Sequence, residues 1–423
     1  MIDRIRRLLR RFGWGFGDQA LSSLENFLLG ILVARAVGAE EFGAFSLAFS
    51  TYLLVMGVSR SVTSDPLIVR FSGVEEPAYK RATGEANGAA FLIGCVGAVA
   101  VVSASFFVRP ALGGALLALG FTLPGLLTQD GWRFAFFAAD QGSKAFVNDL
   151  VWALLLAVMA GAVLFMDQAS AFAFVLVWGA SATIAAGIGI VQSGVVPRPS
   201  RTVPWLRTHK DLAIPFLGQF GALIGGAQLS IYGISAIAGL AAAGALRAAA
   251  ILLGPITMFY RGIRLTAVPD AVRTAKRSPQ ALRGLVTKIS LTLGIGTLAW
   301  GFALLIVPDS ISRELLGETW TGARAIILPI TLSTACGGVI SGLEMGLRAL
   351  AAAKRSFRAR VALAPLVVVG GIAGAFIDGV EGAAWGQFLG MTLGMGIWRW
   401  HFVKALTEAI AAKGQTEASA LDA

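Results

Sequence analysis

Five polar side chains recur along the first long apolar segment of this chain, at Asp18, Gln19, Ser22, Glu25 and Asn26. Positions i, i+1, i+4, i+7 and i+8 share one face of an α-helix. A charged group in hydrocarbon costs about 2.5 to 3.5 kcal/mol, so we expect this stripe to face a water-filled cavity or polar partners. It could hydrogen-bond hydroxyl groups or bind a cation, Na⁺ or H⁺. The simpler interpretation is that it only bonds neighbouring helices.

A second set of charged residues lies near the ends of other apolar segments. In two acid and base pairs, Asp130 with Arg133 and Glu344 with Arg348, the partners are about one turn apart, which favours pairing within one helix. Each residue alone could be an anchor that reaches the head groups. Together, guanidinium groups would match a phosphate, which they bind through two hydrogen bonds. The candidates in this set are Arg60, Asp65, Asp130, Arg133 and Arg261.

The elements that must position these residues are long apolar helices. The chain is 56% apolar and 14% charged, with a mean hydropathy of +0.74. Soluble proteins are about 45 to 50% apolar and about 25% charged. A helix of about 20 apolar residues crosses a hydrocarbon core. Twelve such segments lie near residues 15–37, 42–64, 86–108, 112–135, 146–166, 169–194, 212–238, 241–266, 285–307, 322–346, 359–378 and 382–403. We therefore predict an all-α integral membrane protein with about 12 transmembrane helices.

The basic residues orient these helices. Almost all of the 35 Lys and Arg lie in or beside alternate connections, and cytoplasmic connections are the ones that retain basic residues. Both termini are therefore predicted to be cytoplasmic. Two exceptions, Arg35 and Arg247, flank the first and eighth segments on the side where basic residues are disfavoured. An anionic cargo that crosses the bundle would explain them, so they join the candidate set.

Several classes of protein are disfavoured by the same residues. The net charge of +11 is explained by membrane topology, so we expect anionic membrane lipids and no nucleic acid as partners. The two cysteines, Cys95 and Cys336, lie in apolar segments, and His209 and His401 lie far apart, which indicates neither a disulfide framework nor a metal site. The motifs GxxxxGK, CxxC and GxSxG are absent. We assign no catalytic residue and no cofactor.

The chain divides into two sets of six segments at a basic, proline-containing connection near residues 195–211. We expect an N-terminal bundle at 1–200, a C-terminal bundle at 201–411 and a short cytoplasmic tail at 412–423. A faint repeat at an offset of 201 residues pairs Arg60 with Arg261, each at the end of the corresponding helix. Transporters built from two such repeats bind their substrate between the halves.

Four stretches resemble a known family. Residues 17–23 (GDQALSS) with 33–43 (VARAVGAEEFG) look like the opening hairpin of polysaccharide-exporting flippases, and 129–134 (QDGWRF) with 148–152 (NDLVW) are similar to their fourth and fifth helices. These flippases belong to the multidrug/oligosaccharidyl-lipid/polysaccharide (MOP) exporter superfamily, together with the multidrug and toxin extruders and the lipid II flippases. Since lipid II flippases usually have fourteen spans, the twelve predicted here favour the oligosaccharide branch.

The resemblance implies two six-helix bundles in a V shape that alternate between inward and outward openings. Such a protein would move a lipid-linked, polyprenyl-diphosphate oligosaccharide or polysaccharide precursor between the leaflets of the bacterial inner membrane. Cationic side chains would hold the diphosphate. In this chain Arg60, Arg133 and Arg261 would receive the head group, Arg35 and Arg247 would bind it further out, and the stripe of Asp18, Gln19, Glu25 and Asn26 would bind sugar or a coupling cation.

We therefore expect a transporter and no enzyme. Its expected partners are the lipid-linked oligosaccharide and membrane lipids, with the glycan polymerase machinery as a further candidate, while the oligomeric state stays open. A cation-coupled multidrug extruder of the same fold is the alternative, and it should favour carboxylates over arginines in the membrane. A membrane-embedded glycan polymerase or ligase would need a large outer loop, and the sequence leaves no room for one.

Overall fold

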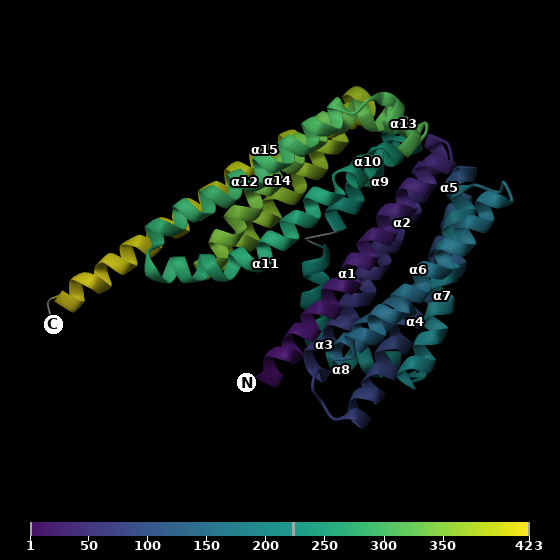
Figure 1. Ribbon diagram of the computed structural model, residues 1–423, viewed down its shortest axis with the longest axis horizontal. Helices are drawn as coiled ribbons and strands as arrows, with labels where there is room; N and C mark the ends of the chain where they lie inside the picture. The colour runs from purple at the N-terminus through teal and green to yellow at the C-terminus, as the bar shows by residue number, and fades with distance from the viewer. Residues whose placement is uncertain (1, 222–224, 422–423) are drawn as a thin grey trace. The chain divides into compact units, whose positions relative to one another are not determined.

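The computed structural model describes the backbone of residues 2–221 and 225–421 and most of their side chains (Figure 1). The side chains of 2–12, 259, 261, 262, 264–266, 269, 414 and 416–421 lie outside this description. The described secondary structure is helical. Its elements are α1 (Ile2–Ala36), α2 (Ala39–Val62), α3 (Ser64–Phe71), α4 (Glu76–Ser105), α5 (Pro110–Ala138), α6 (Gly142–Phe165), α7 (Ala171–Ser193), η1 (Pro199–Arg201), α8 (Thr202–Phe220), α9 (Gly226–Ala238), α10 (Leu240–Leu252), α11 (Gly254–Arg277), α12 (Pro279–Ile306), α13 (Asp309–Leu316), α14 (Thr319–Ala349) and α15 (Ala353–Leu421).

Every predicted membrane segment falls on one or two of these helices. Eight candidate spans among the described residues are long and apolar enough to cross a membrane, namely α2 with α3, α4, α5, α6, α7, α12, α14 and α15 up to Lys413. The last contains two predicted segments, because Asp378 and Gly379 leave the helical conformation and divide α15 into two helices. The predicted segments outside this set are the ones in α1, in α8 with α9, and in α10 with α11. The first of them carries the polar stripe, which lowers its hydropathy.

The chain forms two compact units. Unit 1 contains residues 1–228 and 315–318, and unit 2 contains 229–314 and 319–423. The division follows Gln228 and not residue 200, because α8 packs against α2, α3 and α4 of unit 1. Trp205 of α8 is almost fully buried there, and its indole nitrogen donates a hydrogen bond to the carbonyl of Val62 at 2.9 Å.

Unit 1 is built around α5, which packs against α2, α4, α6 and α7. Glycines allow these close approaches. A side chain at Gly94 would overlap the backbone of Pro124, and one at Gly131 would overlap the side chain of Asn87. Small residues of this kind let membrane helices pack closely. They hold the polar face of α5 at fixed distances from its neighbours.

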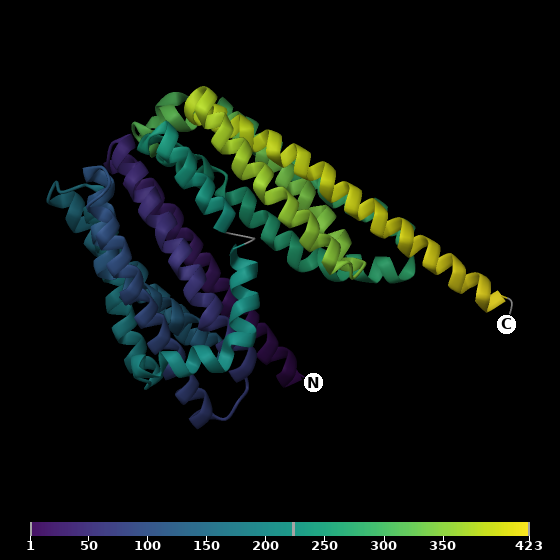
Figure 2. The ribbon, with the colours of Figure 1, turned by 180° about the vertical axis from the view of Figure 1, so that it is seen from behind.

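Unit 2 is built around α14, which packs against α10, α12 and α15. Figure 2 shows the yellow second half of α15 running along this unit. Glycines at 338, 342 and 346 and at 386, 390 and 394 let these helices approach closely. A side chain at Gly342 would overlap Ser290, and one at Gly386 would overlap the carbonyl of Gly370. The two halves of α15 therefore pack backbone to backbone.

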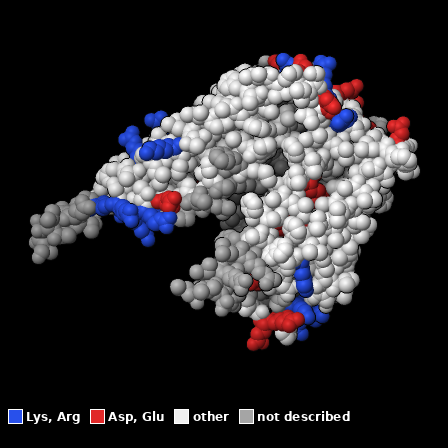
Figure 3. Space-filling model, in the orientation of Figure 1, with Lys and Arg blue, Asp and Glu red and all other residues white. Residues whose placement is uncertain are grey.

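Charged side chains are unevenly distributed over the face that Figure 3 shows. Most of that face is uncharged, and its Lys, Arg, Asp and Glu lie mainly near the margins, with a few in the middle. Together with the apolar helices, this distribution is that of a multi-pass membrane protein.

Candidate functional site

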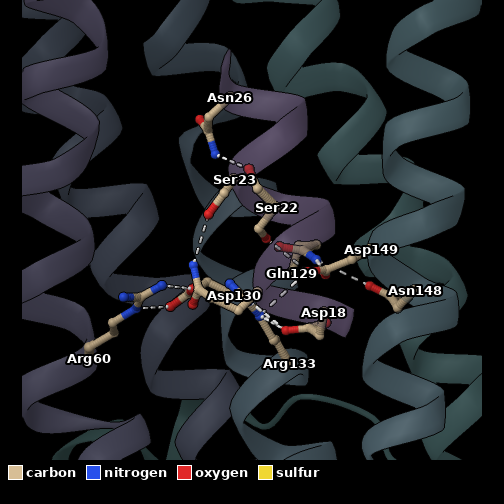
Figure 4. Close-up of polar contacts among 11 residues, drawn as sticks. Asp18, Ser22, Ser23, Asn26, Arg60, Gln129, Asp130, Arg133, Asn148 and Asp149 are labelled. Carbon is tan, nitrogen blue, oxygen red and sulfur yellow. Dashed lines mark hydrogen bonds and ion pairs between the residues drawn. The ribbon is translucent and has the colours of Figure 1, made fainter. Parts of the chain in front are cut away.

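A network of polar side chains lies inside unit 1, where α1, α2, α5 and α6 meet (Figure 4). It joins the polar stripe of α1 to the charged residues of α5, which the sequence placed in two separate sets.

Arg133 of α5 is held by two buried carboxylates. Its Nη2 lies 2.5 Å from Oδ2 of Asp18 on α1, and its Nε donates to the same oxygen at 2.7 Å. The Nε also lies 3.4 Å from Oδ2 of Asp149 on α6. Both carboxylates are 1% exposed and the guanidinium side chain is 17% exposed. Three helices are therefore joined through one arginine.

Arg60 of α2 pairs with Asp130 of α5. Its Nε and Nη2 donate to the two carboxylate oxygens at 2.8 and 2.5 Å, which is the bidentate geometry of a strong ion pair. The guanidinium carbon also lies 4.8 Å from the ring centroid of Phe134. Asp130 is 7% exposed, whereas 30% of the Arg60 side chain is exposed. Arg60 therefore stays reachable from outside the network.

The intrahelical pairing predicted for Asp130 and Arg133 is wrong. Both oxygens of Asp130 are taken by Arg60, and the guanidinium group of Arg133 finds two buried carboxylates on other helices. A buried charge without a partner is more costly than an exposed one, so tertiary contacts win over the local pair. The pair of Glu344 and Arg348 on α14 does form, at 2.6 Å.

Neutral side chains fix the position of Asp149. Gln129 donates to its Oδ1 at 2.7 Å, and the hydroxyl of Ser22 donates to its Oδ2 at 3.2 Å. Gln129 also donates to Asn148 at 3.3 Å, and Asn148 donates to Gln192 of α7 at 2.9 Å. This carboxylate is thus placed by residues from two helices besides its own, α1 and α5, while its neighbour Asn148 is tied to α7.

The rest of the α1 stripe is partly bonded within its own helix. Gln19 donates to the hydroxyl of Ser23 at 3.2 Å, and Asn26 donates to the carbonyl of Ser22 at 2.7 Å. Glu25 is half-buried and interacts electrostatically with Asp149 and Arg133. Of the stripe, Asp18 is fully buried while Gln19 is exposed. The stripe thus runs from the buried network to the surface of α1.

The charges of this network do not balance. It contains four carboxyl groups, from Asp18, Glu25, Asp130 and Asp149, and two guanidinium groups, from Arg60 and Arg133. If all were ionised, the formal charge would be −2 (two positive and four negative charges). An uncompensated charge is costly in this environment. Protonation of one or more of these carboxyl groups would lower that cost.

The remaining candidates lie beside this network, elsewhere in the chain, or outside the described residues. Asp65, in the first turn of α3, is half-buried and interacts electrostatically with Arg60. Arg35 is exposed in the last turn of α1, and Arg247 is half-buried in α10 of unit 2. Arg261 lies in α11, but its side chain is outside the described residues.

Three residues of the network were missing from the sequence-based candidate set, namely Gln129, Asn148 and Asp149. All three lie in the stretches that carry the family resemblance. Their signal is present, because polar side chains inside otherwise apolar helices mark functional positions by default. Asn148 and Asp149 follow only two turns after the start of α6, where polar side chains are also typical of an interfacial helix end.

No family model and no curated protein sequence matches this chain. Several solved structures do match this chain. The inward closed lipid II flippase MurJ is 11% identical over 95% of this chain and 91% of that chain, with a TM-score of 0.67. An inward-facing multidrug resistance transporter of the MATE family and MOP superfamily is 12% identical over 93% and 95%, with a TM-score of 0.66. A MOP superfamily transporter from Pyrococcus furiosus is 12% identical over 96% of both chains, with a TM-score of 0.53. The chain therefore has the MOP transporter fold.

Proposed function

We propose that this chain is a flippase that carries a lipid-linked, polyprenyl-diphosphate oligosaccharide or polysaccharide precursor from the inner to the outer leaflet by alternating access. The bacterial inner membrane is its proposed location. The observation that supports this most is the network of Arg60 and Arg133 with buried carboxylates, inside apolar helices of a fold that a lipid II flippase also has. Charges inside membrane helices are expensive and mark substrate or ion pathways.

Arg60 is the residue proposed to meet the diphosphate first. About a third of its side chain is exposed, while its partner Asp130 is buried. A phosphate accepts the same pair of hydrogen bonds as a carboxylate, so a diphosphate can replace Asp130 as the acceptor. Asp130 would hold the guanidinium group in position when no cargo is bound. It would release this group when the diphosphate takes its place as the acceptor.

Arg133 is proposed to couple cation binding to cargo binding. A proton or Na⁺ on Asp18 and Asp149 would weaken their attraction for Arg133, whose side chain is already 17% exposed. A freed guanidinium group binds phosphate more strongly. By thermodynamic linkage, cargo on Arg133 would in turn favour cation binding by the two carboxylates.

Depletion of the protein in its host tests the proposed function. The lipid-linked precursor should accumulate on the inner leaflet and should disappear again when the wild-type chain is restored. Arg60→Gln and Arg133→Gln should fail to restore export. Arg109→Gln is the matched control, because Arg109 is 70% exposed and pairs with an exposed acid, Glu40. Normal export by the first two variants would exclude this site as the cargo site.

The alternative is a cation-coupled multidrug extruder, and one observation favours it, namely the surplus of carboxyl groups in the network. An organic cation would bind such a site directly. If a lipophilic cation binds the purified protein and Asp18→Asn abolishes the binding, the cargo is a cation and the flippase proposal fails. If a polyprenyl diphosphate binds and the lipophilic cation does not compete, the flippase proposal is supported.

A further inference from the structure

One end of unit 2 carries a cluster of basic residues that the proposed transport mechanism does not use. At its centre is His401, whose electrostatic neighbours are Arg355, Arg358 and Lys404. Arg355 and Arg358 come from the first half of α15 and Lys404 from the second, and the hydrogen bonds between Arg355 and Glu408 join the two halves at this level. Figure 3 shows basic side chains gathered around this end of the unit, where α15 continues toward the C-terminus.

The charges of this cluster are only partly compensated. Arg355 donates two hydrogen bonds to Glu408, both at 2.7 Å. Arg358 and Lys404 are exposed, and neither forms an ion pair with a carboxylate of the described residues. Membrane topology alone would place basic residues on this side of the membrane. It would not require them to gather around the imidazole ring of His401. Like charges that converge repel one another, so an anion between them would stabilise the arrangement.

The surface beside these charges is apolar and exposed. Phe357 precedes Arg358, and Trp400 and Val403 lie within a turn of Lys404, with exposed fractions of 56%, 58% and 47%. The ammonium group of Lys404 lies 5.4 Å from the ring centroid of Trp400. Aromatic rings beside basic residues are typical of the level where lipid head groups meet acyl chains.

We infer that this cluster is a binding site for one anionic phospholipid, held by Arg358 and Lys404 at its phosphate and by Phe357, Trp400 and Val403 along its acyl chain. A lipid fits better than a soluble anion, because the site joins cations to an exposed apolar surface. The inference does not depend on the proposed cargo, since all of its residues belong to unit 2 and the network belongs to unit 1.

Lipid binding to the purified full-length chain in detergent tests this inference. Native mass spectrometry would titrate phosphatidylglycerol, with phosphatidylcholine, which is zwitterionic and has no net charge, as the comparison. The variant Arg358→Gln with Lys404→Gln should bind phosphatidylglycerol about 30-fold more weakly, since each basic residue near a lipid surface contributes about a factor of five to ten. The matched control is Arg283→Gln with Lys288→Gln, two exposed basic residues of α12 in the same unit, and it should bind within about twofold of wild type.

Three outcomes would overturn the inference. These are equal losses in the two double variants, equal binding of phosphatidylglycerol and phosphatidylcholine, and competition by soluble glycerol phosphate at the same concentration as the lipid. If the first double variant does not fold, Lys404→Gln alone serves, because Lys404 is exposed and its loss opens no cavity. It should weaken phosphatidylglycerol binding about fivefold and leave phosphatidylcholine binding unchanged.

Discussion

Arg60 and Asp130 lie 70 residues apart in the chain and form a bidentate ion pair between α2 and α5, with donor to acceptor distances of 2.8 and 2.5 Å. The pair joins a buried acid to a base that is one third exposed. Such an arrangement holds the guanidinium group of Arg60 in place while leaving one side of that group free for a ligand. It is the starting point of the proposed mechanism.

Breaking this pair on one side should destabilise the protein. Asp130→Asn leaves Arg60 without its counterion, and we expect a loss of about 2 kcal/mol. This is less than the 3 to 5 kcal/mol of fully buried pairs, because Arg60 is partly exposed. The double variant Arg60→Gln with Asp130→Asn should lose less than the sum of the single variants. Denaturant unfolding of all four proteins gives this coupling, and additive losses would show that the pair does not stabilise the fold.

Removing a network carboxylate should abolish cation dependence of transport without unfolding the protein. Asp149→Asn keeps an acceptor for Gln129 but loses the charge that holds Arg133. Transport by the wild type should respond to Na⁺ or pH, and the variant should show no response. Asp140→Asn is the control, because Asp140 is exposed with a φ of 62°, a conformation that Asn adopts readily. A response that survives in Asp149→Asn would place the coupling site elsewhere.

A pH effect on stability is expected from His209, outside the predicted span at 212–238. Burial, and then the charge of Arg70, lower the pKa of His209 below its ordinary 6.5. Arg70 donates to Nδ1 at 2.7 Å, which requires the neutral ring. The folded state thus binds fewer protons, so the stabilisation is complete above pH 6.5 and is lost as the pH falls below that value.

The variant His209→Gln isolates this effect, because Gln can accept the bond from Arg70 and does not titrate. The difference in melting temperature between wild type and variant should shrink or reverse when the pH is lowered from 7.5 to 5. A difference that is the same at both values would mean that His209 titrates alike in the folded and unfolded states.

Glycine packing in α15 predicts opposite outcomes for two similar substitutions. Gly386→Ala would force its methyl group onto the carbonyl of Gly370, whereas Gly396 has open space around its position. We expect Gly386→Ala to destabilise unit 2 by about 1 to 3 kcal/mol and Gly396→Ala to stabilise it by up to about 1 kcal/mol. Melting temperatures in one detergent give the comparison. Equal shifts would contradict close packing of the two halves of α15.

The helices were predictable from the sequence because the apolar segments are long and hydrophobic. Each predicted segment falls on one or two helices, apart from residues 222–224, which lie outside the described residues. The polar stripe of α1 was predictable from its spacing alone. The resemblance to the MOP superfamily pointed to the fold that the solved structures share. These features depend on local patterns, which one sequence contains.

The pairing inside the site was not predictable. Spacing along α5 favoured Asp130 with Arg133, but each residue bonds to another helix. Whether a local or a tertiary partner wins depends on which carboxylates are buried beside the guanidinium group, and helix packing decides that. The importance of Asp149 was missed for the same reason, because its partners Ser22 and Gln129 come from distant parts of the chain.

The most direct test of the central claim is the rate at which purified protein in liposomes moves a fluorescent polyprenyl-diphosphate oligosaccharide between leaflets. We predict rapid translocation by wild type and by Arg109→Gln, and a rate at the level of empty liposomes for Arg60→Gln and Arg133→Gln, with all four proteins folded. Translocation at the wild-type rate by both site variants would contradict the account.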